Sequence, residues 1–83
     1  MFGAANNSHH ESYAVILEEY QEAQEEESTF LSQLINFWQC VKQNRADAAF
    51  VWLELMQCSA EKIAAEWIQV AAMCHKAKKT KTM

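Results

Sequence analysis

Residues 13–41 of the chain read YAVILEEYQEAQEEESTFLSQLINFWQCV, and this stretch decides the fold. Apolar side chains recur in it at spacings of three and four, which places them on one side of an α-helix. The series runs through Tyr13, Leu17, Tyr20, Gln24, Glu27, Leu31, Leu34, Trp38 and Val41. Only Gln24 and Glu27 interrupt its apolar character. We therefore predict a long helix that uses this stripe for contacts with another helix.

The composition favours helices throughout. The 83 residues include one glycine and no proline, and 51% of them are hydrophobic. β-Hairpins need glycine, proline or Asn-Gly turns, and large catalytic folds such as the TIM barrel need far more residues. We predict one all-α domain over residues 8–79, with a flexible N-terminal arm at 1–7 and a flexible C-terminal tail at 80–83. Ser8 and Glu11 form a capping box that starts the helix at His9.

A second helix is predicted after a turn at Asn44 and Arg45. Asn44 is a favourable helix cap, and Asp47 suits the positive end of the helix that follows. The second apolar series consists of Ala49, Trp52, Met56, Ile63, Trp67, Val70, Cys74 and Ala77. Folding the two series together gives a long helical hairpin in which Glu27 lies opposite Lys62. Breaks at Ser28-Thr29 and at Ser59 would give three or four shorter helices instead.

The chain has more apolar surface than two helices can cover. Phe30, Phe37 and Ile68 lie beside the two series, and Trp67, a member of the second series, is assigned with them to the flank of the predicted contact. Burying a stripe this wide takes three or four helices. We therefore predict that the hairpin completes a bundle with a second copy, as a homodimer, or with another helical protein, and that these four residues line the contact. A monomer that closes its own core with short helices is the alternative.

Charge is distributed unevenly along the chain. Residues 1–43 hold seven glutamates against one lysine, whereas residues 44–83 hold six basic and four acidic residues. The acidic face is expected to contain Glu18, Glu19, Glu22, Glu25 and Glu26. Such a run is typical of a solvated helix face, and it would also suit a basic partner or imitate the charge of DNA. Nucleic-acid binding is not expected, because the lysines cluster in a short tail of an acidic chain.

One motif resembles part of a known active site. Glu18-Glu19-x-x-Glu22 on a long helix resembles half of the motif of the MazG-like nucleotide pyrophosphohydrolases, and that resemblance implies Mg²⁺-dependent hydrolysis. The family completes its site with ExxD on a following helix, whereas the nearest match here, Asn44 to Asp47, lacks the glutamate. A single glycine excludes a glycine-rich phosphate loop, and no histidine has the context of a catalytic base. We predict no catalytic residues, metal ligands or cofactor.

The cysteines indicate a reducing compartment. Cys40, Cys58 and Cys74 contain no CxxC pair and are odd in number, so we expect free thiols and a cytoplasmic location. No apolar run approaches the roughly 20 residues that span a bilayer. We predict a small helical protein–protein interaction module, such as an adaptor or a chaperone-like subunit, without catalytic activity. An acidic inhibitor of a basic groove and, after it, the Mg²⁺-dependent hydrolase are the alternatives.

Overall fold

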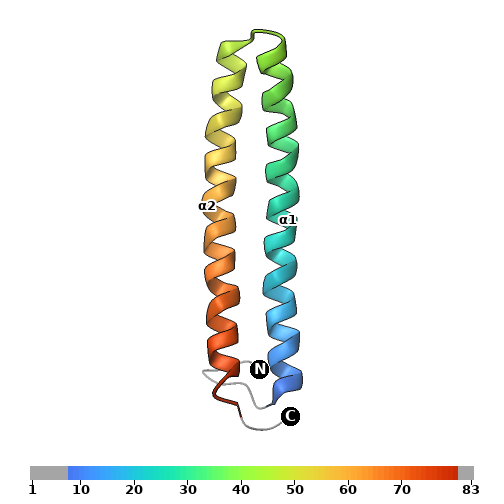
Figure 1. Cartoon of the computed structure of the whole chain (residues 1–83), viewed down its shortest axis with the longest axis vertical. Coiled ribbons are helices and arrows are strands. Elements are labelled where there is room, and N and C mark those ends of the chain that lie inside the picture. Colours follow the sequence, from blue (N-terminus) through green and yellow to red (C-terminus); the bar gives the residue numbers. More distant parts are fainter. Residues whose placement is uncertain (1–7, 81–83) are drawn as a thin grey trace.

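The computed structural model describes residues 8–80 and shows a hairpin of two long antiparallel helices (Figure 1). Helix α1 spans His9–Lys42 and helix α2 spans Ala46–Ala77. The chain measures 58 × 18 × 15 Å along its principal axes. The predicted all-α hairpin is confirmed, and residues 8–80 contain no strand. The arm predicted at 1–7 and residues 81–83 of the predicted tail lie outside the described residues.

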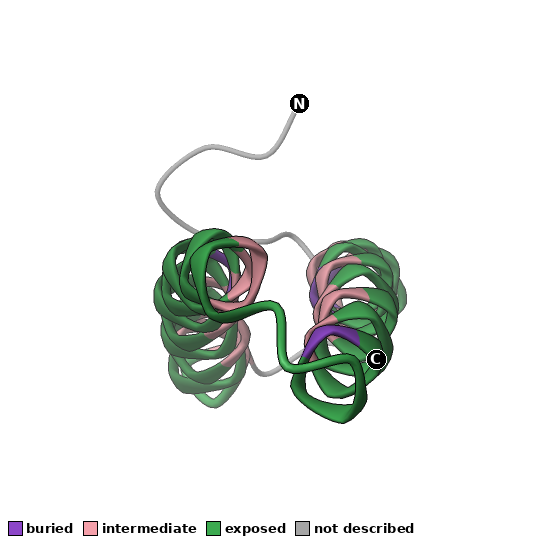
Figure 2. Cartoon of the chain, turned by 90° about the horizontal axis from the view of Figure 1, so that it is seen from above, coloured by how far each residue is buried: buried purple, intermediate pink, exposed green. Residues whose placement is uncertain are grey.

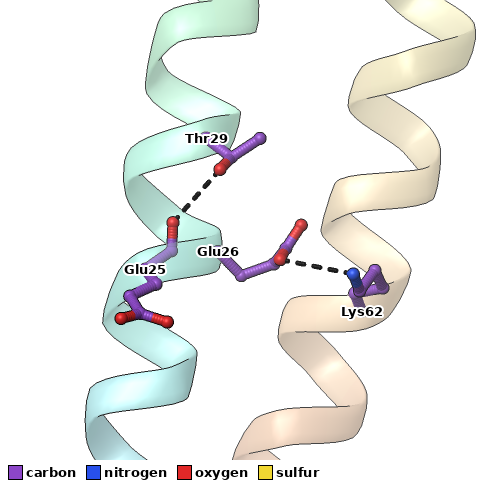
Figure 3. Close-up of polar contacts among 4 residues, drawn as sticks. All are labelled: Glu25, Glu26, Thr29 and Lys62. Atoms are coloured by element: carbon purple, nitrogen blue, oxygen red, sulfur yellow. Dashed lines mark hydrogen bonds and ion pairs between the residues drawn. The ribbon is translucent and has the colours of Figure 1, made fainter.

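Neither helix is broken, so the alternative of three or four shorter helices is wrong. At one expected break, the Thr29 hydroxyl donates a hydrogen bond of 3.2 Å to the Glu25 carbonyl oxygen one turn earlier (Figure 3). This bond satisfies the threonine hydroxyl inside the unbroken helix. At the other, Ser59 is 5% exposed and lies within α2. A small side chain at this position allows close approach of the two helices.

The ends of the helices follow from their capping residues. The Ser8 side chain accepts a hydrogen bond of 3.3 Å from the Glu11 backbone N–H, which confirms the predicted start at His9. Asn44 has a φ of 56°, a left-handed conformation that asparagine tolerates better than most residues. The N–H of Asn44 donates to the Val41 carbonyl and the N–H of Arg45 to the Cys40 carbonyl, as in a Schellman motif. Asn44 therefore ends α1; the N-cap of α2 is Arg45, without a side-chain cap bond.

On α1 the positions that face the other helix differ from the prediction by one residue, whereas on α2 most predicted positions are confirmed. Along α1 the buried and half-buried residues recur at spacings of three and four, as inner positions 12, 16, 19, 23, 26, 30, 33, 37 and 40. On α2 the inner positions are 49, 52, 56, 59, 63, 66, 70, 73 and 77. Each residue of the predicted α1 stripe is the next residue in sequence after an inner position. Every residue of the stripe except Leu17 is exposed. On α2, Glu66 and Met73 replace the predicted Trp67 and Cys74.

Small and polar side chains occupy much of the seam between the helices. Its most buried residues are Ala23, Ser12, Ser59 and Cys40, at 0%, 3%, 5% and 6% exposure. No large side chain among the described residues is fully buried, and the Gln33 Oε1 atom is buried without a hydrogen-bond partner. Figure 2 shows the less exposed positions of both helices turned toward each other, with exposed residues around the rest. The hairpin therefore has little apolar core of its own.

Candidate interaction surface

The residue after each inner position lies on one broad side of the hairpin. Successive helical residues are rotated by about 100°, and in an antiparallel pair this rotation takes both helices to the same side. Contacts among Tyr20 and Glu27 of α1 and Trp67 of α2 support the placement of these residues on one side. The rings of Tyr20 and Trp67 meet edge to face with centroids 5.9 Å apart, and the Trp67 indole N–H donates a 3.0 Å hydrogen bond to Glu27 Oε2. Each of the three follows an inner position.

We call this side the apolar face. It carries nine of the thirteen large apolar residues that are exposed among the described residues. From α1 it contains Tyr13, Leu17, Tyr20, Gln24, Glu27, Leu31, Leu34, Trp38 and Val41, and from α2 Phe50, Leu53, Gln57, Ala60, Ala64, Trp67, Ala71 and Cys74. Monomeric proteins rarely expose a continuous apolar surface of this length.

Several polar groups of the apolar face have hydrogen-bond partners within the chain. The Gln24 amide donates a 3.1 Å hydrogen bond to the Tyr20 hydroxyl, and Glu27 accepts the bond from Trp67. The Gln57 amide donates to Glu61 Oε2 at 3.3 Å. A partner that covers the face therefore meets polar groups that already have partners, which lowers the cost of removing them from water.

The four residues predicted to line a contact occupy different environments. Phe30 and Phe37 are half-buried at inner positions of α1. Trp67 is 40% exposed on the apolar face, whereas Ile68, at 67% exposure, lies one residue further round α2. Sequence reasoning missed Leu34 and Trp38 as candidates because it assigned their stripe to the seam. The spacing of that stripe identified these residues as one side of a helix, but it did not show that this side faces away from the seam.

The opposite side of α1 is polar. The residues that precede inner positions there include Glu18, Glu22 and Glu25, which are exposed, and we call this side the polar face. At its edge Glu26 Oε2 lies 3.5 Å from Lys62 Nζ, while Glu25 points away from α2 (Figure 3). Lys62 thus pairs with Glu26 and not with the predicted Glu27, again a displacement by one residue. The lysine is largely exposed, so the pair contributes little stability.

Three carboxylates converge between the helices at this edge. Oxygen atoms of Glu19, Glu22 and Glu66 lie within 4.8 Å of one another. Partial desolvation, with the neighbouring Glu22 and Glu18, raises the pKa of Glu19. Desolvation, followed by the charge and hydrogen bonding of Glu66, raises the pKa of Glu22. Such a group can share a proton or hold a divalent cation through its oxygens.

The cluster does not reproduce the arrangement that the resemblance to the MazG-like enzymes implies. Glu19 and Glu22 are brought together with Glu66, which sequence reasoning had not connected with them. Asp47 lies in the first turn of α2, next to the hairpin turn. Glu22 is 20 residues before the end of α1, which corresponds to roughly 30 Å along the helix. The two parts of the motif are therefore far apart within one chain.

We expect the hairpin to gain stability as the pH falls from 7 toward 4.5, the ordinary value for glutamate. Because folding raises the pKa of Glu19 and Glu22, the folded chain binds protons more readily than the unfolded chain, and its stability decreases as the pH rises through that range. Glu22→Gln should raise the melting temperature at pH 7 and reduce its pH dependence. Thermal unfolding followed by circular dichroism measures both effects.

Glu54→Gln, an exposed substitution near the turn, is the matched control and should not raise the melting temperature at pH 7. A lower melting temperature for Glu22→Gln at pH 7 would show that the Glu22 charge stabilises the fold, and the account of this cluster would then be wrong.

Comparison with known proteins adds no assignment: no family model, curated protein or solved structure matches the chain. Within residues 8–80, neither helix is both long enough and apolar enough to cross a membrane. The interpretation of the apolar face therefore depends on its own chemistry and geometry.

Proposed function

We propose that this chain is a helical protein–protein interaction module, without a catalytic role, that completes a bundle by binding a helical partner through its apolar face. The observation that supports the proposal is the face itself. Large apolar side chains such as Trp38, Leu31 and Phe50, which are 55%, 56% and 61% exposed, follow one side of both helices. Aromatic residues and the scarcity of charge are typical of the centre of an interface.

The energetics of the hairpin support the same proposal. Full burial of a large apolar side chain contributes about 1.5–3 kcal/mol. No large side chain within residues 8–80 is fully buried, and the stability of a whole small domain is only about 5–15 kcal/mol. A partner that covers the apolar face supplies the missing burial. An adaptor or a chaperone-like subunit in the reducing cytoplasm, where the three free cysteines stay reduced, fits this description.

Site-specific photo-crosslinking in the native host tests the proposal. Benzoylphenylalanine placed at Leu34, on the apolar face, is expected to give a protein adduct whose crosslinked peptide lies in a helix of the same or another protein. The same analogue at Asn36, on the polar side of α1, is the matched control and should give little adduct. Equal adduct from both positions, or none from Leu34, would contradict a protein-binding role for the apolar face.

A second candidate is supported by the polar face. Glu18, Glu22 and Glu25 form one exposed acidic row along α1, as a decoy for a basic groove requires. Binding through this row would weaken steeply as salt is raised, whereas an apolar interface responds little. Crosslinking from Asn36 that exceeds that from Leu34, and that is lost at high salt, would favour the acidic inhibitor.

A further inference from the structure

The apolar face also identifies the partner, in an inference that rests on the proposed function. We infer that the partner is a second copy of this chain, packed face to face and antiparallel. The turn of each hairpin then lies over the open end of the other, and the two copies form a four-helix bundle. The size, the charge and the layering of the face each support this arrangement.

The size of the face calls for two long helices. A surface 58 Å long and 18 Å wide has a footprint on the order of 1000 Å², more than the roughly 800 Å² that each partner buries in a stable complex. The face extends along the whole hairpin, from Tyr13 at the open end to Phe50 beside the turn, and Gln24, Glu27 and Gln57 are its polar interruptions near the middle. A single helix about 10 Å wide would leave much of this width uncovered. A second hairpin of the same dimensions covers all of it.

The charges are arranged so that two acidic copies can approach. The formal net charge of the chain is −4, which by itself opposes association. The acidic row of Glu18, Glu22 and Glu25 lies on the polar face and would point outward from a face-to-face dimer. Among the described residues of the apolar face the one acidic group is Glu27, which is hydrogen-bonded to Trp67 of its own chain. Positive charge lies at its two ends, where Lys42 Nζ is 5.7 Å from the Trp38 ring centroid and Lys78 follows the end of α2. Acidic charge in the contact surface is therefore limited to one glutamate from each copy.

The residues of the apolar face form layers across the two helices, and the side chains in these layers favour an antiparallel dimer. Tyr20 and Trp67 lie at one level, as their ring contact shows. Seven-residue steps from this pair place Glu27 level with Ala60, and a further step places Leu34 level with Leu53. With a two-fold axis at the level of Glu27, the layer of Tyr20 and Trp67 in one copy packs against the layer of Leu34 and Leu53 in the other copy.

A parallel dimer would instead collect four aromatic rings in one layer and four leucines in another. Protein interiors are packed to nearly uniform density, so mixed layers fill the bundle more evenly. At the axis, Glu27 faces Glu27 and Ala60 faces Ala60 of the other copy, and the two small alanine side chains leave space beside the two glutamates. Away from this level, the antiparallel bundle matches large side chains to smaller ones.

Spin-label distances distinguish the arrangements in the full chain. A variant without native thiols (Cys40→Ala, Cys58→Ser and Cys74→Ala) receives one label through Gln43→Cys, next to the turn. Gln43 lies 16 residues from Glu27, so an antiparallel dimer separates the two labels by about 50 Å. A parallel dimer brings them to about 20 Å, since packed helices lie 8–10 Å apart. Sedimentation of the same samples gives the mass.

A dimer with a distance near 50 Å is the expected result. Adding Leu34→Asp and Trp38→Asp should abolish the distance, whereas adding Ser32→Asp and Gln39→Asp on the polar side should preserve it. A distance near 20 Å would overturn the antiparallel arrangement. A folded monomer would overturn the second copy as partner, and crosslinking from Leu34 to a different protein would then still support the proposed function.

Discussion

Replacing Leu34 and Trp38 by aspartate is expected to abolish self-association and to reduce the helical content of the dilute chain. Both residues lie on the apolar face, where they are 41% and 55% exposed in the hairpin. Residues central to an interface each cost about 2 kcal/mol or more when truncated, so the double substitution should weaken dimerisation more than about 100-fold. Folding should weaken with it, because association stabilises the folded chain by mass action. Sedimentation velocity and circular dichroism at matched concentrations measure the two effects.

The matched control introduces the same charges on the polar side of α1. Ser32→Asp and Gln39→Asp are both exposed substitutions, and we expect them to change dimer affinity by less than about tenfold. A difference between neighbouring residues sharpens the comparison: Trp67→Asp should disrupt the dimer, whereas Ile68→Asp should have little effect. If the polar-side pair dissociates the dimer as effectively as the apolar-face pair, net charge and not the apolar face controls association.

Ala23→Leu is expected to destabilise the chain by about 1–3 kcal/mol. Of the residues that the structure describes, Ala23 is the one at 0% exposure, and it lies at an inner position near the middle of α1. Three additional carbon atoms at this position have no space, so the helices must separate or the leucine must adopt a strained rotamer. Urea titration at a fixed chain concentration measures the loss as a lower midpoint.

Ala14→Leu provides the control, because it is the same substitution on the exposed side of α1. It should change the free energy of unfolding by less than about 0.5 kcal/mol. Equal losses for the two variants, or no loss for Ala23→Leu, would mean that the helices do not approach closely at Ala23.

Hydrophobic spacing predicts the two helices of this chain but not the sides that they turn to each other. The stripe from Tyr13 to Val41 and the row of inner positions are adjacent on α1 and share the same spacing. Choosing the more apolar series selects the larger side chains, yet two helices without a third partner approach most closely through small residues such as Ala23 and Ser59. The spacing fits two adjacent rows of residues on α1 that are offset by one position. It does not show which row contacts α2 and which row faces outward.

The same ambiguity explains what was missed at the polar edge. Glu66 joins Glu19 and Glu22 only when the inner positions are known, because the cluster depends on residues from both helices. The turn was located correctly, whereas the role of Asn44 was not: asparagine serves both as an N-cap and in the left-handed conformation that ends a helix. Its φ of 56° assigns the second role.

Sedimentation equilibrium of the unmodified chain tests most directly whether the apolar face is an interface between two copies. The chain mass is 9.6 kDa, and the account predicts a species of twice that mass over micromolar concentrations, with helical structure that is lost together with the dimer on dilution. A single species of 9.6 kDa that stays fully helical and unfolds cooperatively at every concentration would contradict it.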